Sequence, residues 1–251
     1  MPGLYRDRGV VLRSVKLGET DRIVSFLTEG RGKVRAVAKG IRRPGSRFGA
    51  RLEPTTHVAL QLYEGRNLDV VTQVECLDVH RSLREDYESF TAAISFLEAA
   101  DHVAQEGCAN IGVYRLLVGA LRTLASSSRP AVPAGFFWKL LSIEGVHPLL
   151  DACARCEAPV TPVATVAFDP GEGGVVCLGC AGPGPVTVSP PTRGIVTRIL
   201  SGELRSVMAE PPGPALREAE SLALRALEYH LERRLRSRTL LTATPPVSGH
   251  R

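Results

Sequence analysis

Two closely spaced pairs of cysteines constrain the fold of this chain more than any other feature. Cys153 and Cys156 make one pair, Cys177 and Cys180 make the other, and twenty residues separate the pairs. Two residues between cysteines allow one tight turn to present both sulfurs to a single ion. The intervening segment is rich in glycine, proline and valine and has no helical periodicity, so we expect strand, turn and strand that return the chain to the first pair. The pattern predicts a zinc ribbon over residues 151–188.

Four thiolates fill the tetrahedral shell of zinc, whereas a catalytic zinc keeps one position open for water. We therefore expect one structural zinc ion per chain, held by Cys153, Cys156, Cys177 and Cys180. A redox pair of the Cys-x-x-Cys type and a coincidental grouping are the alternatives. Neither pair is followed by the glycine that such a turn favours, since Glu157 and Ala181 stand there. Cys76 and Cys108 are isolated in apolar patterns and are expected to be small core residues.

The first 80 residues are expected to form a small β-barrel. Short β-branched runs alternate with turn residues, and the break from Gly40 to Pro54 is longer and basic. Five short strands within about 75 residues favour an OB-fold barrel. The predicted strands are Val10–Val15, Arg22–Leu27, Lys33–Val37, Thr56–Leu62 and Leu68–Val74.

Helical periodicity replaces the strand pattern after Arg81. Apolar residues spaced by three and four predict a helical domain in two parts, 81–150 and 189–241, with the ribbon inserted between them. A tail over 242–251 is expected to be disordered. The fold class is thus α+β and multidomain: an N-terminal five-stranded OB-fold β-barrel over 1–80, then an α-helical domain with a four-cysteine zinc-ribbon insertion. Helices are expected near 87–101, 113–124, 136–143, 192–200 and 214–236.

A run of basic residues without an intervening acid lies within the predicted barrel. The flanking acids are Glu29 and Glu53, and the net charge of the chain is only +5, so the positive charge is localised. Glycine and proline interrupt the run, which favours a strand and loop laid along a polyanion over a helix face. A charged sheet edge that prevents aggregation is the alternative, but eight like charges exceed what that role needs. A nucleic-acid phosphate backbone is the obvious polyanion, and the residues predicted to bind it are Arg31, Lys33, Arg35, Lys39, Arg42, Arg43, Arg47 and Arg51.

Two further features are weaker indications of nucleic-acid binding. The adjacent residues Phe136, Phe137 and Trp138 are a candidate base-stacking platform, although neighbours on a helix face different ways and at least one must be core. A cluster of arginines is expected to end the last helix, where cations suit the helix dipole, and a second phosphate contact is the competing interpretation. These arginines are Arg233, Arg234, Arg236 and Arg238.

Several classes of protein are disfavoured. The sequence has no clustered carboxylates for a catalytic metal and no histidine in a recognisable nucleophile context, so we expect no enzymatic activity. No apolar run approaches the roughly eighteen residues needed to span a bilayer, and the N-terminus lacks the apolar stretch of a signal peptide. We therefore expect a cytoplasmic protein that does not contact a membrane.

Specific segments resemble the RecO family of bacterial recombination mediators. Residues 18–24, Gly-Glu-Thr-Asp-Arg-Ile-Val, and residues 38–48 resemble the N-terminal signature of the family. Residues 140–156, from the Leu-Leu pair to the first cysteine pair, and residues 235–238, Leu-Arg-Ser-Arg, resemble its central and C-terminal landmarks. The resemblance runs from about residue 5 to residue 241. Some members lack the cysteines, so zinc is implied by this sequence rather than by membership.

The resemblance implies an OB-fold, a helical domain and a zinc ribbon in a protein that binds single- and double-stranded DNA and anneals complementary strands. Family members work with RecR and with the single-stranded-DNA-binding protein (SSB) to load RecA, and they use no nucleotide cofactor. A zinc-ribbon RNA-binding or transcription accessory protein is the main alternative, because phosphate contacts do not distinguish DNA from RNA. A phosphoryl-transfer enzyme is the other, and the lack of clustered carboxylates disfavours it.

Overall fold

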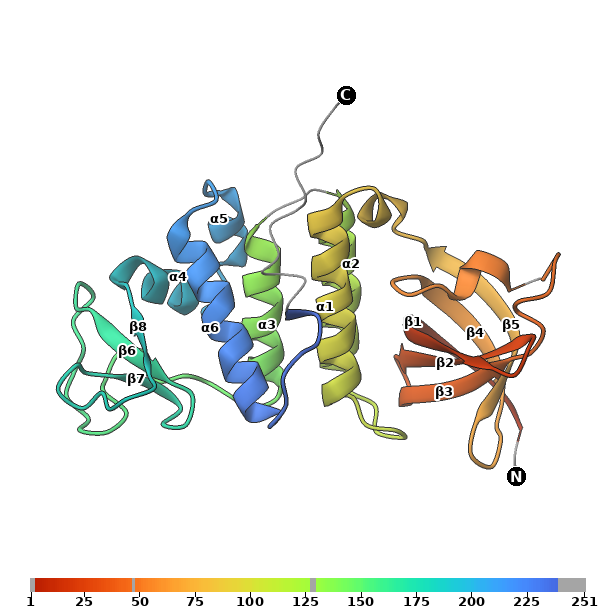
Figure 1. Ribbon diagram of the computed structural model, residues 1–251, viewed down its shortest axis with the longest axis horizontal. Helices are drawn as coiled ribbons and strands as arrows, with labels where there is room; N and C mark the ends of the chain where they lie inside the picture. The colour runs from red at the N-terminus through yellow and green to blue at the C-terminus, as the bar shows by residue number, and fades with distance from the viewer. Residues whose placement is uncertain (1–2, 47, 127–129, 239–251) are drawn as a thin grey trace. The chain divides into compact units, whose positions relative to one another are not determined.

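A computed structural model of the chain describes residues 3–46, 48–126 and 130–238, and these residues form two compact units. The first unit contains the described residues up to 126 together with 235–238, and the second contains residues 130–234. Figure 1 shows a barrel and two helices in the first unit, and helices with a small sheet in the second. The tail that is predicted to be disordered, 242–251, lies outside the described residues.

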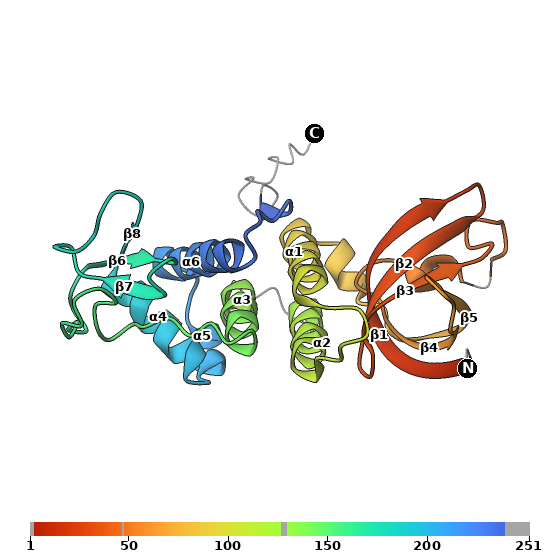
Figure 2. The ribbon, with the colours of Figure 1, turned by 90° about the horizontal axis from the view of Figure 1, so that it is seen from below.

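A closed barrel of five strands begins the first unit. The order around the barrel is β1-β2-β3-β5-β4, with neighbours antiparallel except for a short parallel contact between β3 and β5. This is the arrangement of an OB-fold, so the predicted barrel is confirmed. Figure 2 shows the strands curving around a common interior. The strands are β1 Leu4–Leu17, β2 Asp21–Thr28, β3 Gly32–Ala38, β4 His57–Tyr63 and β5 Asp69–Asp78.

Alternation of side chains along the strands builds the barrel core. Phe26 of β2 and Val34 and Ala36 of β3 belong to this core. The residues that alternate with core residues along these strands, such as Ser25 and Arg35, point to the outer face. The short 3-10 helix Gly49–Leu52 follows the basic loop and adds the buried side chain of Leu52 to the core. The outer face is therefore where charged strand residues lie.

Two helices, α1 Tyr87–Val103 and α2 Ile111–Ser126, cover part of that outer face. A second 3-10 helix, Arg81–Arg84, precedes α1, and the carboxylate of Asp86 caps α1 by accepting a hydrogen bond from the Ser89 backbone N–H at 2.8 Å. Both helices contact β1. Val10 and Leu27, outward-facing partners on β1 and β2, are consequently buried. The helix pair thus belongs to the barrel's unit.

The loop after α1 lies against the beginning of β3. The Lys33 backbone N–H donates to the carbonyl oxygen of Gln105 at 3.0 Å. Gly32 has a φ of 68°, and a Cβ added there would stand 2.0 Å from the carbonyl oxygen of Cys108. Only glycine allows this close approach of the two backbones.

The second unit is built on α3 Ala131–Ile143 and α6 Pro214–His230, with α4 Pro190–Leu200 and α5 Leu204–Ala209 beside them. The Trp138 indole N–H donates to the Ala219 carbonyl oxygen at 3.0 Å and joins α3 to α6. Helix α3 begins five residues before the predicted start at Phe136, because Pro133 stands in the first turn, where no backbone N–H is needed. None of the helices in the described parts of the chain has the length and apolar character needed to cross a membrane.

The last helix ends at His230, not near Arg236 as the leucine spacing predicts. Glu232 adopts a left-handed φ of 50° just past the helix. The Arg233 N–H donates to the Glu228 carbonyl at 3.0 Å, and the Glu232 N–H donates to the Tyr229 carbonyl at 3.1 Å. This pair of bonds is the Schellman motif that terminates helices, and it forms here without the usual glycine.

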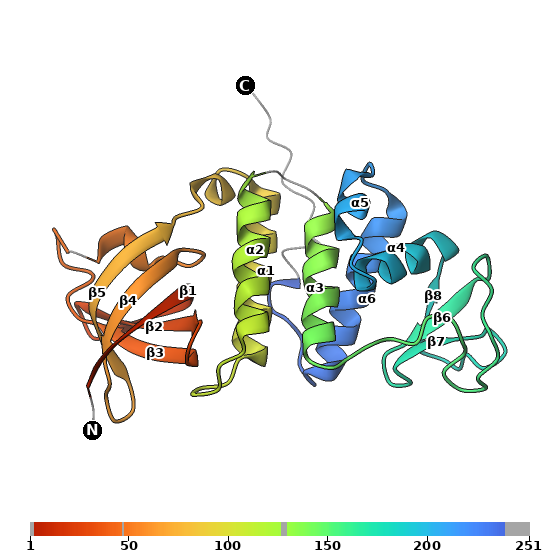
Figure 3. The ribbon, with the colours of Figure 1, turned by 180° about the vertical axis from the view of Figure 1, so that it is seen from behind.

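A three-stranded sheet lies between α3 and α4 in the sequence. It contains β6 Val166–Asp169, β7 Gly174–Val176 and β8 Val186–Val188, in the order β7-β6-β8 (Figure 3). The first two strands form the hairpin that the sequence predicts, and β8 is an additional strand. Phe168 of β6 packs its ring edge-on to Trp138, with the ring centroids 6.0 Å apart. The sheet is thereby attached to the helices of its own unit.

Candidate metal centre and nucleic-acid interface

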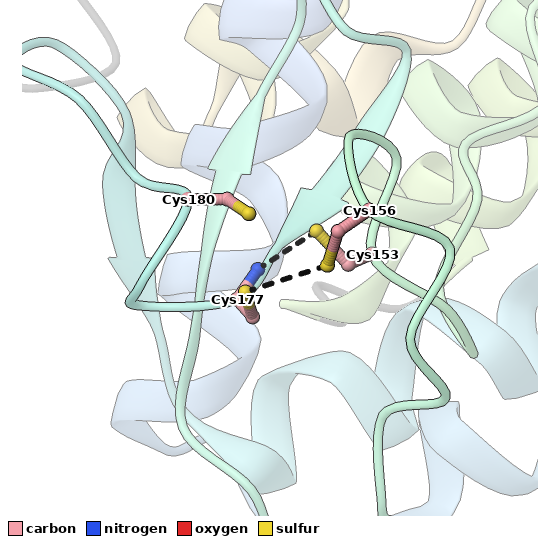
Figure 4. A group of neighbouring side chains, drawn as sticks. All are labelled: Cys153, Cys156, Cys177 and Cys180. Atoms are coloured by element: carbon pink, nitrogen blue, oxygen red, sulfur yellow. Dashed lines mark hydrogen bonds between the residues drawn. The ribbon is translucent and has the colours of Figure 1, made fainter.

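The four cysteines of the two pairs come together beside the small sheet. Cys153 and Cys156 lie in the segment before β6, Cys177 directly follows β7, and Cys180 lies one turn later (Figure 4). Their Sγ atoms all lie within 4.8 Å of one another. The sequence prediction that these residues cluster for metal binding is confirmed.

The distances fit a four-thiolate metal shell. A tetrahedral zinc with Zn–S bonds of about 2.3 Å holds its sulfurs about 3.8 Å apart. The Sγ atoms of Cys156 and Cys177 are 3.9 Å apart, which is far longer than a disulfide bond of about 2.05 Å. Four sulfurs in this arrangement leave no position for a reacting water, so the centre suits a structural ion.

The backbone around the cluster favours a thiolate at its buried member. Cys153 is fully buried, and the Cys177 backbone N–H donates to its Sγ at 3.3 Å. Hydrogen bonds from the backbone N–H groups of Cys156 and Cys177 lower the pKa of the Cys153 thiol to about 6. Hydrogen bonds with the Cys177 and Cys156 side chains raise the pKa of the Cys180 thiol to about 12. A bound cation would remove that proton as well, because coordinated thiols are deprotonated.

Arg155, between the cysteines of the first pair, ties the two pairs together. Its Nη1 donates to the Cys180 carbonyl oxygen at 2.7 Å, and its Nε donates to Glu172 at 2.9 Å. A second carboxylate, that of Asp169, lies 3.5 Å from Nη2. Arg155 is not part of the sequence prediction. The sequence feature that comes nearest to predicting these contacts is a lone arginine between paired cysteines, followed by two acidic residues in the predicted hairpin.

The turn after the first pair requires a left-handed residue. Glu157 has a φ of 60°, and its N–H donates to the Cys153 carbonyl oxygen at 2.9 Å. Ala181, at the equivalent place after the second pair, has no positive φ. The glycine expected from the pattern is therefore needed after one pair only, where Glu157 takes its conformation.

In the barrel's unit, three of the predicted DNA-binding residues gather in one exposed loop. Lys39 follows β3, and Arg42 and Arg43 lie in the next turn. The Arg42 backbone N–H donates to the Thr20 carbonyl oxygen at 3.0 Å, and its Nη1 donates to the Glu19 carbonyl oxygen at 2.9 Å. These bonds hold the loop against the turn between β1 and β2. We call Lys39, Arg42 and Arg43 the loop cluster.

The carboxylate of Asp21 fixes the beginning of this loop. It accepts hydrogen bonds from the Gly40 N–H at 2.7 Å and from the Thr20 hydroxyl at 2.8 Å. These two bonds, and to a smaller degree the charges of Arg43 and Lys39, lower the pKa of Asp21. The carboxylate stays ionised at neutral pH and holds the backbone of the loop in place.

Two further cations extend the positive surface near the loop cluster. Lys16 of β1 and Arg22 of β2 are direct partners across the two strands. Arg22 is also opposite Ala38, the residue before Lys39. Neither residue belongs to the sequence prediction, although strand pairing across the short β1–β2 turn is the signal that brings them together.

Lys33 and Arg35 lie on the part of the barrel that α1 and the loop after it cover. The Lys33 Nζ is 2.7 Å from the Asp101 carboxylate, and both side chains are about 15% exposed. Arg35 Nη1 is 3.8 Å from Glu106. Asp101 also accepts a hydrogen bond from Arg13 Nε at 2.9 Å. The basic run is thus divided between an open loop and a strand that is paired with carboxylates.

The remaining members of the run lie elsewhere on the unit. The Arg31 guanidinium stands 3.8 Å above the centroid of the Tyr5 ring and 3.6 Å from the Glu64 carboxylate. Arg51 is exposed on the first 3-10 helix. Arg47 lies outside the described residues. A DNA-contact role for all eight residues stays a prediction.

The two weaker candidates have structural explanations. Phe136, Phe137 and Trp138 are all buried, so they belong to the core and present no stacking surface. The expectation that the C-terminal arginines end the last helix is wrong, because α6 stops at His230 and Arg233 belongs to the motif that terminates it.

Comparisons with known proteins agree on one family. The family model described as recombination protein O N terminal matches residues 1–80, and the one described as recombination protein O C terminal matches residues 84–239. A protein of a Nocardioides species named DNA repair protein RecO is 43% identical over 238 residues, covering 93% of this chain and 97% of that relative. A protein of the same name from Cutibacterium acnes is 44% identical over 245 residues, covering 94% and 98% respectively.

Proposed function

The chain belongs to the recombination protein O family of DNA repair proteins, and from this premise we propose that it is a recombination mediator. In this role it binds single- and double-stranded DNA, anneals complementary strands and, with RecR, helps load RecA onto single strands coated with SSB. It acts through binding rather than catalysis and works in the cytoplasm, at the nucleoid. RecR and SSB are its direct partners and RecA an indirect one.

The observation that carries the proposal is the exposed loop cluster with Lys16 and Arg22 beside it. Five cations, on the loop and on the adjoining ends of β1 and β2, present positive charge together. Contacts of this kind neutralise phosphates and supply affinity without reading sequence. Arg31, Arg51 and Arg47 are proposed as further phosphate contacts.

We also propose that the four cysteines hold one structural zinc ion. The residues around it, 151–188, make a ribbon whose buried cluster contains Cys153, Ala167 and Val176. So small a core needs a metal to stay folded, as in other small metal-bound domains. We propose the ribbon as a domain of its own, inserted between the helical parts 81–150 and 189–241.

The electrostatic proposal is tested by the salt dependence of binding to labelled single-stranded DNA. Each neutralised phosphate contributes about −0.7 to the slope of log affinity against log salt, so five engaged cations give a slope of about −3.5. We expect this slope with oligonucleotides of unrelated sequence. A flat salt response would contradict phosphate binding, and a strong preference for one sequence would indicate base readout.

Competition and partner experiments separate the mediator from its alternatives. If the chain is a DNA-repair protein, an unlabelled DNA oligonucleotide should displace bound labelled DNA at a lower concentration than an RNA oligonucleotide of the same sequence does. Purified RecR and SSB should each be retained by the immobilised chain, and incubation with DNA and magnesium should leave the DNA intact. Retention of neither partner would leave a DNA-binding protein without a mediator role.

A further inference from the structure

The outer face of β1, β2 and β3 carries a second group of cations, distinct from the loop cluster. Arg13 is the strand partner of Ser25, and Ser25 is the strand partner of Arg35. Directly opposed residues point to the same face of a sheet. Arg13 and Arg35 therefore flank Ser25 in one row, and Lys33, two residues before Arg35, lies on the same face. We call Arg13, Lys33 and Arg35 the covered row.

One carboxylate holds two members of the covered row. Arg13 Nε donates to Asp101 Oδ2 at 2.9 Å, and Lys33 Nζ donates to the Asp101 backbone carbonyl at 2.7 Å. Lys33 Nζ also forms an ion pair with Asp101 Oδ1 at 2.7 Å, although Oδ1 accepts no hydrogen bond among the described residues. The Asp101 side chain is only 15% exposed. Two oxygens shared between two cations reproduce the contacts that a phosphate group makes.

Asp101 does not stabilise its own helix at the position where it stands. Asp101 stands in the last turn of α1, where the helix dipole disfavours an anion. The two cations of the barrel offset this cost. Asp101 is therefore suited to occupying the covered row rather than to ending α1.

A second carboxylate, that of Glu106, pairs more weakly with the third cation, Arg35. Glu106, in the loop after α1, is 3.8 Å from Arg35 Nη1, and both side chains are at least 40% exposed. The Nε of Arg35 is buried and has no hydrogen-bond partner among the described residues. An exposed pair at this distance contributes at most about 1 kcal/mol, so another anion can displace Glu106.

We propose that the covered row is a second phosphate-binding site, occupied by Asp101 and Glu106 until nucleic-acid phosphates compete for its cations. This inference rests on the proposed nucleic-acid binding of the barrel. DNA that reaches the row must separate the end of α1 and the loop after it from β3. The carboxylates thereby keep the covered row out of DNA binding by the free protein.

The decisive variant is Asp101→Asn, which removes the charge and keeps the shape of the side chain. It should bind single-stranded DNA at least threefold more tightly than the wild-type chain at moderate salt. The slope of log affinity against log salt should become steeper by about 0.7 to 1.4, because one or two further phosphates are engaged. Adding Arg13→Gln and Lys33→Gln together to Asp101→Asn should cancel the gain.

Glu88→Gln is the matched control, since it removes one negative charge from the first turn of the same helix. It reports the effect of net charge alone and should leave the slope unchanged. Thermal unfolding of each variant verifies the fold. The proposal is overturned if folded Asp101→Asn protein binds with the affinity and slope of the wild-type chain or of Glu88→Gln.

Glu106→Gln keeps the test decisive if Asp101→Asn prevents folding, because the Glu106 carboxylate is exposed and pairs only with Arg35 among the described residues. This variant should steepen the slope by about 0.7, and adding Arg35→Gln should restore the wild-type value. A wild-type slope for Glu106→Gln would then contradict the proposal. A wild-type chain that binds no DNA contradicts the proposed function. In that case the covered row is contradicted as well if the carboxylate variants bind no DNA either, and it is supported if they bind.

Discussion

Glu157 is a strained residue at the edge of the metal centre. Its φ of 60° places an exposed glutamate in the left-handed region, where a side chain costs about 1 kcal/mol and glycine costs nothing. Glu157→Gly should therefore stabilise the ribbon and slow the loss of metal to a chelator by a few fold, since metal binding and folding are coupled. Ala181→Gly, made where φ is not positive, should accelerate the loss. Equal effects of the two substitutions would contradict the strain at Glu157.

His57 makes the barrel's unit sensitive to acid. Its Nε2 lies 2.8 Å from the Tyr114 hydroxyl of α2, and burial lowers the pKa of the imidazole to about 4. Burial also lowers the pKa of His80. The unfolded chain binds more protons than the folded one between the folded and unfolded pKa values. The stability from these neutral histidines is therefore complete above about pH 6.5 and is lost as the pH falls towards 4.

We predict that His57→Gln weakens this acid dependence. Calorimetric unfolding of the variant should show a smaller fall in stability between pH 6.5 and pH 4 than the wild-type chain shows, by about 2 kcal/mol or less. His147→Gln is the control, because His147 is exposed in the other unit. The same acid slope in His57→Gln and wild type would show that His57 is protonated in the folded state.

At the scale of elements, local patterns predict strands and helices well, and they fail where distant segments meet. Short β-branched runs between turn residues locate all five barrel strands, and the cysteine spacing locates the metal centre. The leucine stripe extends the last helix too far, because Glu232 takes the left-handed position without being glycine. The pairing of Lys33 with Asp101, 68 residues away, depends on the packing of α1 on the barrel, and no local pattern carries it.

The ribbon provides the clearest prediction about an element. The wild-type chain should contain about one equivalent of zinc, and Cys156→Ser or Cys177→Ser should lose it and unfold the ribbon. Trp138 is the one tryptophan of the chain and packs against Phe168, so its fluorescence should report this unfolding. DNA binding by the barrel should survive. Less than about half an equivalent of zinc, in protein never exposed to chelator, would contradict a four-cysteine zinc site.

At the scale of the whole molecule, two positive surfaces are candidates for the main DNA-binding site: the loop cluster and the arginines that follow α6. The loop cluster lies in the barrel's unit. Of the arginines that follow α6, Arg233 and Arg234 belong to the second unit and Arg236 belongs to the first. The loop is anchored by the Arg42 backbone N–H and by Asp21, and the Arg42 side chain adds an exposed hydrogen bond to the Glu19 carbonyl. Charge reversal removes that exposed bond but keeps the backbone anchors, so it should leave the fold intact. Both surfaces can be reversed by three substitutions each, which makes them directly comparable.

We predict that Lys39→Glu, Arg42→Glu and Arg43→Glu together reduce DNA affinity and strand annealing at least tenfold at moderate salt. Three lost phosphate contacts should also make the salt slope shallower by about 2. Zinc content should not change, because the cysteines lie in the other unit. The matched variant, Arg233→Glu, Arg234→Glu and Arg236→Glu, should lose less affinity in the same fluorescence-anisotropy titration. Wild-type binding by the loop variant, with failure of the C-terminal variant, would move the main DNA site from the barrel to the segment after α6 and leave the family membership untouched.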